Sequence, residues 1–262
     1  MSDAEGNTIV TDTVSQSPQY APSSVHRYEV IFGQDFVSSG GLETTELFCK
    51  TLPIQKGTRV LDVGCGLGGS AFYMSRTYGA HVTGVDIQAE MIHGATQRAT
   101  ERGTKHVRFI QGDILEMDLD ERAYDLAYSR DAFLHIEDKA TLFKRLHSCL
   151  APGGQLFITD YATGPAPLTD EFTNYVADTG YFLSELPEYG SLIEQAGFAE
   201  VVVVDESDRL RETLYKEIDK IKTSPADLTQ EDIEYLVKRW ELKIRCLKRG
   251  DMKWGSFRAT AK

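Results

Sequence analysis

The stretch YSRDAFLHIED, residues 128–138, gathers ionisable side chains directly after an apolar run that we predict to be a buried strand. It contains one arginine, three carboxylates and one histidine. A carboxylate such as Asp131 can hold a cationic group, and a histidine such as His135 exchanges protons near neutral pH. Together they could bind a protonated amine and remove its proton. A histidine near a helix start is often only structural, but its pairing with Asp131 at a strand end favours the chemical interpretation.

A glycine-rich segment, VLDVGCGLGG at residues 60–69, carries the spacing G-x-G-x-x-G at positions 64, 66 and 69. Glycines at this spacing let the chain turn sharply and let a ligand approach the backbone closely. Asp86 ends the next apolar run, where a carboxylate can accept hydrogen bonds from both hydroxyls of a ribose. The pattern indicates a nucleoside-containing cofactor, and by itself it also fits a nicotinamide dehydrogenase.

Two further carboxylates favour S-adenosylmethionine over a dinucleotide. Asp62 stands two residues before the first glycine, where it would repel a pyrophosphate and attract the ammonium and sulfonium of S-adenosylmethionine. Asp113 follows a third apolar run and could bind an adenine amino group while Ile114 covers the ring. Three successive strand ends thus carry an aspartate; the alternative is that these acids only cap loops.

Strand-like and helix-like segments alternate along the chain, which is typical of a parallel sheet with crossover helices. We expect strands at 59–64, 81–87, 106–113, 124–131, 155–161 and 201–206, and an antiparallel last strand at 254–261. We expect helices at 25–32, 44–50, 70–79, 89–102, 138–150 and 191–198, the fifth of them ended by Ala-Pro-Gly-Gly. The predicted fold class is α/β, a Rossmann-like seven-stranded, mostly parallel sheet with helices on both faces.

Two segments, residues 162–190 and roughly 207–250, do not fit the alternation and are expected to be helical or loop inserts. Because both follow strand ends, they could fold over the carboxyl edge of the sheet, where open α/β sheets bind their ligands. We therefore expect a single domain over residues 19–262 with a helical lid over the strand C-terminal edge. Residues 1–18, rich in Ser, Thr, Gln and Asp, are expected to form a disordered tail.

Composition narrows the classes of partner and compartment. The net charge of −12 argues against nucleic acid, although residues 238–262 hold nine basic side chains against two acidic ones. That basic segment is either a solvated helix face or a local anion site. No apolar run reaches the roughly 20 residues of a membrane span, and the first residues show no signal-peptide pattern. Four scattered cysteines fit a reducing cytoplasm, and no cluster has the spacing of metal ligands.

VLDVGCGLGG resembles the first motif of class I S-adenosylmethionine-dependent methyltransferases, a resemblance that covers about residues 59–160. Over about residues 19–262 the chain resembles phosphoethanolamine N-methyltransferases in their compact, single-domain form. The matching segments are Gln19-Tyr20, Tyr28 with IFGQDFVSSGG, SRDAFLH, ITDY and KIRCLKRGDMKWGSF. The resemblance implies successive methylations of phosphoethanolamine to phosphocholine. We expect the enzyme to be a monomer in the cytoplasm. Its methyl donor would be S-adenosylmethionine, and S-adenosylhomocysteine would be the second product.

The same resemblance implies roles for residues at matching positions. Tyr20 and His135 would form the catalytic pair that orients the amine and moves its proton, with Asp131 against the amine. The substrate would be surrounded by Gln19, Tyr20, Tyr28, Asp131, Tyr161, Tyr175, Tyr181 and Lys243. S-adenosylmethionine would contact Val37, Ser38, Asp62, Gly64, Asp86, Ile87, Asp113, Ile114 and Arg130. For an isolated tyrosine such as Tyr175, ordinary half-buried packing is the alternative.

One position departs from the family pattern Tyr-Val-x-x-Arg-x-Tyr. Residues 175–181 read YVADTGY, so Thr179 stands where the resemblance implies an arginine on the phosphate. Arginine binds phosphate through two parallel hydrogen bonds, and its loss commonly lowers affinity roughly a hundredfold. Lys243, Arg245 or another basic group of the 238–262 segment could replace it; otherwise the acceptor differs.

Three other interpretations remain open from the sequence. SRDAFLH and SSGGL also resemble glycine, sarcosine and dimethylglycine methyltransferases, whose acceptor bears a carboxylate in place of the phosphate. A nicotinamide dehydrogenase would use the same glycines but leaves Asp62 and Asp113 unexplained. A non-catalytic S-adenosylmethionine-binding protein would bind the cofactor without using Tyr20 and His135.

Overall fold

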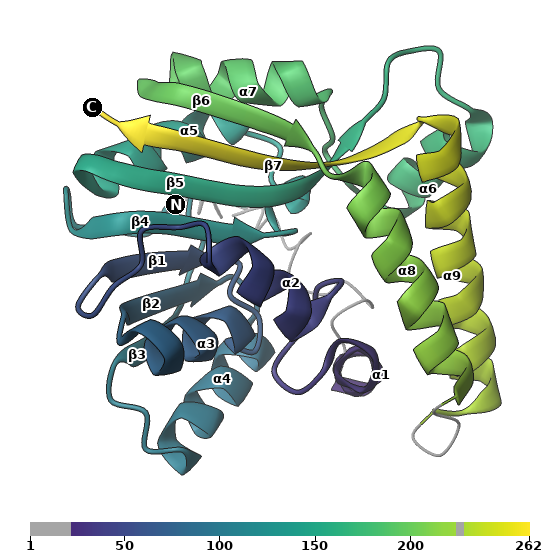
Figure 1. Ribbon diagram of the computed structural model, residues 1–262, viewed down its shortest axis with the longest axis horizontal. Helices are drawn as coiled ribbons and strands as arrows, with labels where there is room; N and C mark the ends of the chain where they lie inside the picture. The colour runs from purple at the N-terminus through teal and green to yellow at the C-terminus, as the bar shows by residue number, and fades with distance from the viewer. Residues whose placement is uncertain (1–21, 224–227) are drawn as a thin grey trace, which may run out of the picture.

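The computed structural model describes residues 22–223 and 228–262, and within them seven strands form one sheet in the order β3-β2-β1-β4-β5-β7-β6 (Figure 1). The strands are β1 Arg59–Val63, β2 His81–Asp86, β3 Val107–Gln111, β4 Tyr124–Arg130, β5 Leu150–Thr163, β6 Phe198–Asp205 and β7 Met252–Ala261. Neighbours from β3 to β5 pair in parallel, whereas β7 is antiparallel to both β5 and β6. The predicted mostly parallel sheet with an antiparallel last strand is confirmed.

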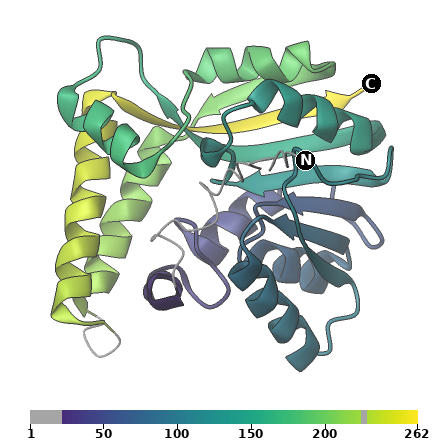
Figure 2. The same cartoon turned by 180° about the vertical axis from the view of Figure 1, so that it is seen from behind.

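Helices cover both faces of the sheet, as expected for central strands that are apolar on both sides (Figures 1 and 2). The helices are α1 Pro22–Phe32, α2 Gly41–Cys49, α3 Gly69–Tyr78, α4 Ala89–Glu101, α5 Lys139–Cys149, α6 Asp170–Thr179, α7 Leu186–Gln195, α8 Ser207–Thr223 and α9 Gln230–Arg249. On one face α2 packs Phe48 against Phe157 of β5, with ring centroids 5.1 Å apart. On the other face α5 and α7 bring Phe143 and Tyr189 within 5.6 Å. The two aromatic layers fix the sheet between the helices.

Strand β5 is longer than the sequence predicted. It begins at Leu150, directly after α5, so the Ala-Pro-Gly-Gly segment lies inside the strand and does not separate it from the helix. Leu150 pairs with Tyr124, and the register then shifts before Leu126 pairs with Gln155. A bulge of this kind takes up extra residues, and it tolerates proline and glycine that regular pairing would exclude.

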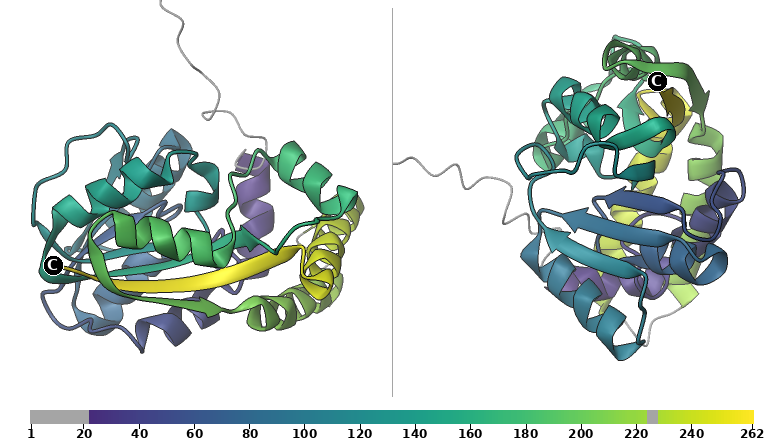
Figure 3. Two further views of the ribbon diagram at one scale, coloured as in Figure 1. Left: turned by 90° about the horizontal axis from the view of Figure 1, so that it is seen from above. Right: turned by 90° about the vertical axis from the view of Figure 1, so that its left-hand side faces the viewer.

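Helices α6, α8 and α9 stand at the carboxyl end of the sheet (Figure 3). The end of β5 pairs with the start of β7, Thr163 with Met252, so α6 leaves and α9 arrives at the same edge. Thr229 and Asp232 form a capping box that starts α9, and Trp240 on this helix stacks on Phe32 of α1 at 6.0 Å. The segments 162–190 and 207–250 thus include the helices at this edge. The single domain over residues 19–262, with these two segments as lid inserts, and the disordered tail over 1–18 remain predictions.

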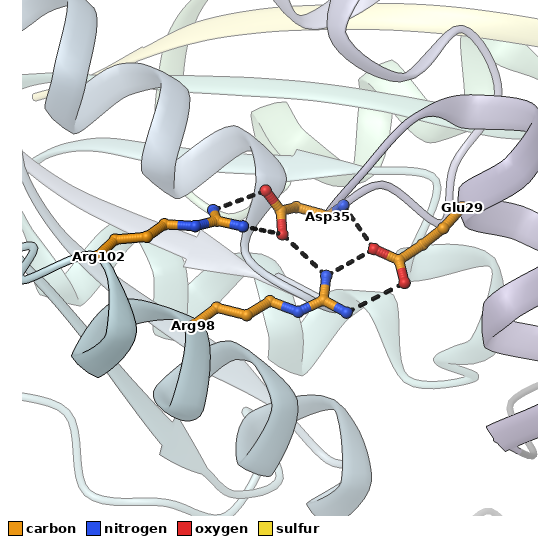
Figure 4. A network of polar contacts seen from close by, with 4 residues as sticks. All are labelled: Glu29, Asp35, Arg98 and Arg102. Carbon is orange, nitrogen blue, oxygen red and sulfur yellow. Dashed lines mark hydrogen bonds and ion pairs between the residues drawn. The ribbon is translucent and has the colours of Figure 1, made fainter.

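An ion-pair cluster ties α1 and the loop after it to α4 (Figure 4). Arg98 donates to both carboxylate oxygens of Glu29, at 2.6 and 3.0 Å, and to Asp35 at 2.8 Å. Arg102 binds both oxygens of Asp35, whose backbone N–H donates to Glu29 at 2.7 Å. The backbone oxygen of Asp35 accepts from Gly69 at the start of α3. The cluster therefore holds Asp35 against the start of α3.

Replacing Arg98 by methionine is expected to lower the free energy of unfolding by about 2 kcal/mol, between the values for exposed and buried ion pairs. The reason is that Arg98 bridges two carboxylates that are only 19% and 11% exposed, and these would be left facing each other. Urea unfolding at neutral pH measures the effect. Arg76→Met on the exposed side of α3 is the control and should change stability by less than about 0.5 kcal/mol. Equal losses in both variants would contradict the proposed contribution of the cluster.

Candidate active site

A cavity of about 520 Å³ opens at the carboxyl edge of β1, β2 and β4. Loops that follow these strands form its wall together with residues 35–38 of the loop after α1. The volume lies in the range of small-molecule sites. All nine residues predicted to contact S-adenosylmethionine line it: Val37, Ser38, Asp62, Gly64, Asp86, Ile87, Asp113, Ile114 and Arg130. We call this space the cofactor cavity.

The glycine loop between β1 and α3 requires glycine at two positions. Gly64 has a φ of +71°, and a side chain there would place its Cβ 2.2 Å from that of Ala132. Gly66 has a φ of +52°, and its Cβ would lie 2.8 Å from Val37. Side chains at these positions would be both strained and crowded, so only bare backbone can form this wall of the cavity.

Asp86, at the end of β2, is oriented by backbone donors. One of its oxygens accepts from the N–H of Gly66 at 2.9 Å, and the other accepts from the N–H of Gln88 at 3.0 Å. Burial raises the pKa of this carboxyl, and the backbone donors act in the opposite direction. Each carboxylate oxygen has a second lone pair. Asp86 can therefore accept further hydrogen bonds from a pair of ligand hydroxyls.

Asp62 is a buried acid at the floor of the cavity. Its Oδ2 has no hydrogen-bond partner among the residues that the structure describes. Burial raises the pKa of Asp62 to about 7, the charge of Asp86 adds to the rise, and Arg130 opposes it. A cationic ligand group beside it would favour the ionised form. This orphaned carboxylate fits the cationic amino-acid end of S-adenosylmethionine and gives no partner to a pyrophosphate.

Arg130 connects the cavity wall to the segment before α2. Its guanidinium donates to the backbone oxygens of Ser39 and Gly41, at 2.6 and 3.0 Å, and to the Thr45 hydroxyl at 2.8 Å. The side chain is 6% exposed. Its hydrogen bonds hold residues 39–41 in place, so Arg130 shapes the cavity as well as lining it.

A polar hollow of about 40 Å³ adjoins the cofactor cavity and shares Val37, Ser38, Asp131 and His135 with it. Its other polar wall residues come from α1, the segment before α2, β5, the segment after α6, and α9: Tyr28, Ser39, Tyr161, Tyr181, Arg239 and Lys243. A group bound in this polar hollow would therefore meet the cofactor cavity at Asp131 and His135.

Asp131 follows β4 in a left-handed backbone conformation, with a φ of +52°. Its Oδ1 accepts from the indole N–H of Trp254 at 2.7 Å and from the Thr159 hydroxyl at 3.0 Å. The other oxygen, Oδ2, is buried and has no partner among the described side chains and backbone groups. Burial raises the pKa of this carboxyl. One oxygen is thus anchored, and the other can bind a cation at the junction of the two spaces.

His135 ends the 3-10 helix Phe133–His135 and packs edge-on against Tyr181, with ring centroids 5.2 Å apart. Burial lowers the pKa of His135 to about 4, and the positive charges of Lys139 and Arg239 add to the shift. The imidazole is therefore neutral at neutral pH. A neutral imidazole beside Asp131 can accept a proton.

Lys243 and Arg239 lie one turn apart on α9 and both line the polar hollow. Lys243 donates to the Tyr161 hydroxyl at 2.9 Å; burial lowers its pKa to about 7, with the charge of Arg239 acting in the same direction. Arg239 donates to the Tyr181 hydroxyl at 3.3 Å and lies over the ring of Tyr175 at 5.9 Å. Two basic side chains in so small a space favour an anionic ligand.

Only some of the other residues predicted to bind the substrate line the polar hollow. Tyr28, Tyr161, Tyr181 and Lys243 line the polar hollow, whereas Tyr175 lies behind Tyr181, with ring centroids 5.9 Å apart. Gln19 and Tyr20 lie outside the described residues. Arg245 is exposed and pairs with Glu171 at 2.7 Å, so it does not replace the missing arginine.

Three supporting residues were not found from the sequence. Trp254 of β7 anchors Asp131, as described above. Lys139 is buried and donates to the backbone oxygens of Ile136 and Phe182, at 2.8 and 2.6 Å, which holds the segment after His135. Glu217 of α8 accepts from the Gly40 N–H at 2.7 Å and the Trp240 indole at 2.6 Å. Each depends on contacts between distant segments, which no local pattern reveals.

A family model described as a methyltransferase domain matches residues 54–235. The chain is 37% identical over 255 residues to a phosphoethanolamine N-methyltransferase of Plasmodium falciparum, and the match covers 95% of this chain and 95% of that protein. The chain belongs to the phosphoethanolamine N-methyltransferase family.

Other members of the phosphoethanolamine N-methyltransferase family are longer. The chain is 40% identical over 246 residues to phosphoethanolamine N-methyltransferase 1 of Triticum aestivum. This match covers 92% of the chain and 49% of that protein, so the chain spans about half of the relative's length. A Haemonchus contortus phosphoethanolamine N-methyltransferase 2, solved with phosphomonomethylethanolamine and S-adenosylhomocysteine, superposes with a TM-score of 0.90 at 30% identity. That superposition covers 92% of this chain and 58% of the other.

Residues 22–223 and 228–262 contain neither a membrane-spanning helix nor a group of metal ligands. No helix there is both long and apolar enough to cross a membrane. In the same residues, no three His, Cys, Asp or Glu side chains are grouped so that they could hold a metal ion.

Replacing Asp86 by alanine is expected to weaken S-adenosylhomocysteine binding about 100-fold, because the ligand would lose the charged acceptor predicted for its ribose. Isothermal titration calorimetry of the free protein measures the dissociation constant. Asp120→Ala, an exposed acid near the opposite edge of the sheet, is the control and should change the constant less than about twofold. Unchanged binding in Asp86→Ala would contradict the predicted ribose contact.

Proposed function

We propose that the protein transfers methyl groups from S-adenosylmethionine to the nitrogen of phosphoethanolamine, in successive steps that lead to phosphocholine. The observation that carries the proposal is the junction of the two spaces. The cofactor cavity, with the orphaned Asp62, meets at Asp131 and His135 a hollow that contains two basic side chains, Arg239 and Lys243. A substrate with an ammonium at one end and a phosphate at the other matches this order of charges.

The cofactor residues fit S-adenosylmethionine. Asp62 would face its cationic amino-acid end, Asp86 its ribose hydroxyls, and Asp113 with Ile114 its adenine; the bare glycine loop would let it approach the backbone. When bound, S-adenosylmethionine supplies an electrophilic methyl group.

The chain's own residues would prepare the amine acceptor. An amine is protonated at neutral pH, since its reference pKa is near 10, and it must lose a proton to expose its lone pair. Oδ2 of Asp131 would hold the ammonium. The neutral His135 would take the proton, directly or through the phenol of Tyr20, and release it to solvent after each transfer.

Positioning would contribute much of the rate. Lys243 and the phenols of Tyr28 and Tyr161 would hold the phosphate end, so that the nitrogen stays at the junction. Methylated products carry a diffuse positive charge, which the faces of Tyr20 and Tyr181 would stabilise by cation–π contact. The lid segments and the N-terminal segment would exclude water.

The assay that tests the proposal follows S-adenosylhomocysteine formation with six acceptors offered separately. They are phosphoethanolamine, its mono- and dimethyl forms, glycine, sarcosine and dimethylglycine. We expect turnover with the three phosphate esters. Turnover only with the carboxylate-bearing amines, or with none of the six, would overturn the proposed acceptor. The second of these results, together with intact S-adenosylhomocysteine binding, would favour a non-catalytic binding protein.

We further propose that the protein acts as a monomer in the cytoplasm. The resemblance to the compact, single-domain form supports the first point. The four cysteines are free and buried, as in a reducing compartment, which supports the second. Light scattering of the purified protein would give the mass of a single chain, and a dimer mass would contradict the first point. Fractionation of the source cells tests the second.

A further inference from the structure

The polar hollow holds its two basic side chains in different ways. Lys243 is bound to a phenol, and its charge also faces Asp131 and Glu217. Arg239 faces phenols: Nη2 donates to Tyr181, Nη1 donates to Tyr235 at 3.3 Å, and the guanidinium lies over Tyr175. Tyrosine rings therefore fix the plane of the guanidinium at the wall of the hollow.

Position 179 cannot supply a ligand to the hollow in this chain. The Thr179 hydroxyl donates to the backbone oxygens of Tyr175 and Val176, at 2.7 and 3.2 Å, within its own helix α6. Thr179 is not among the residues that line the hollow. The rings on both sides of it in the sequence, Tyr175 and Tyr181, are instead the ones that Arg239 contacts from α9. Arg239 of α9 thus contacts the two tyrosines on either side of position 179, where this sequence lacks an arginine.

We propose that Arg239 is the arginine that binds the phosphate of the acceptor, delivered from α9 in place of a residue at position 179. Arg239 would thereby select a phosphate ester over a carboxylate-bearing amine. The inference rests on the proposed function and names the residue that decides its substrate class. Arginine presents a planar fork that binds two phosphate oxygens at once, which the point charge of Lys243 cannot do. Because Arg239 and Lys243 are four residues apart on one helix, their charges converge on the same ligand group.

The test compares Arg239→Gln and Arg239→Lys with the unaltered protein. In Arg239→Gln we expect the KM for phosphoethanolamine to rise about 100-fold with kcat changed less than about threefold, since binding of the phosphate is uniform through the reaction. The KM of Arg239→Lys should lie between those of Arg239→Gln and the unaltered protein, because lysine keeps the charge and loses the planar fork. S-adenosylhomocysteine affinity should stay within about twofold in all variants, which also reports that they are folded.

Two further variants separate a phosphate contact from a packing role. Arg245→Gln removes a basic residue from the exposed side of the same helix and should leave both parameters unchanged. Adding Thr179→Arg to Arg239→Gln should restore at least about tenfold of the lost affinity, because a guanidinium then returns to the same rings. A packing defect would not be repaired by that change. The inhibition constant of phosphocholine, measured with the same variants, should follow the KM.

The possible failures are distinguishable. If the unaltered protein methylates phosphoethanolamine and Arg239→Gln keeps its KM, the role of Arg239 is overturned while the proposed function stands. If Arg239→Gln raises the KM for phosphoethanolamine and the added Thr179→Arg does not lower it again, Arg239 acts by packing and the proposed phosphate contact is overturned. If the unaltered protein ignores phosphoethanolamine and binds no phosphocholine, both proposals fall together.

Discussion

Replacing His135 by alanine is expected to lower kcat for the first methylation of phosphoethanolamine about 1,000-fold, the usual scale for losing a positioned general base. His135 lines both the cofactor cavity and the polar hollow, so it borders the place where the nitrogen would be methylated. Its pKa is lowered to about 4 by burial and by the charges of Lys139 and Arg239, so it is neutral at neutral pH, the form that a general base requires. S-adenosylhomocysteine binding should remain within about twofold, since the ring supplies no predicted cofactor contact.

Controls for His135→Ala use both activity and stability. His93→Ala, an exposed histidine on α4, should leave kcat unchanged. In the folded protein His135 binds fewer protons than in the unfolded chain between its folded pKa of about 4 and the reference value of 6.5. Folding stability should therefore fall as the pH drops through that window, and His135→Gln should reduce the slope. Full turnover in His135→Ala would remove the histidine from the mechanism, whatever the stability data show.

The cofactor cavity could be predicted from the sequence because its residues follow strands. A glycine loop and an acid near the carboxyl end of each of three parallel strands must meet at one edge, since parallel strands all end there. Asp62, Asp86 and Asp113 all line the cavity for that reason. The extra length of β5 was missed because Ala-Pro-Gly-Gly is a helix stop in most contexts. Only the pairing of the flanking residues Leu150 and Gln155 with β4 places it in a strand.

The polar hollow was harder to predict because it is assembled from distant segments. The 238–262 segment does not by itself show which basic side chains face the hollow. Its one local signal for Arg239 is the spacing of four residues from Lys243, which puts both side chains on one face of the helix. Trp254 reaches Asp131 only through the antiparallel register of β5 with β7, in which Tyr161 pairs with Trp254. Strands β5 and β7 are far apart in the sequence, so no local pattern shows which of their residues pair.

Replacing Asp131 by asparagine is expected to lower kcat/KM for phosphoethanolamine about 1,000-fold, the scale of a buried charge contact. Oδ1 already accepts from Trp254 and Thr159, so the amide nitrogen must take the place of Oδ2. The substrate ammonium would then face a donor where it now has an acceptor. The opposite orientation of the amide would set that donor against the Trp254 indole, so neither orientation satisfies both partners.

Steady-state kinetics with phosphoethanolamine measure this effect, and Trp254→Phe is the matched comparison. It removes a donor to Oδ1 and leaves the charge on Asp131, so we expect only about a tenfold loss, from a less firmly oriented carboxylate. The two variants therefore separate the charge of Asp131 from its orientation. If Asp131→Asn lost no more activity than Trp254→Phe, the carboxylate would serve only to position the loop after β4, where its φ of +52° already sets it apart. A loss confined to Asp131→Asn would instead show that the carboxylate charge holds the acceptor nitrogen beside His135.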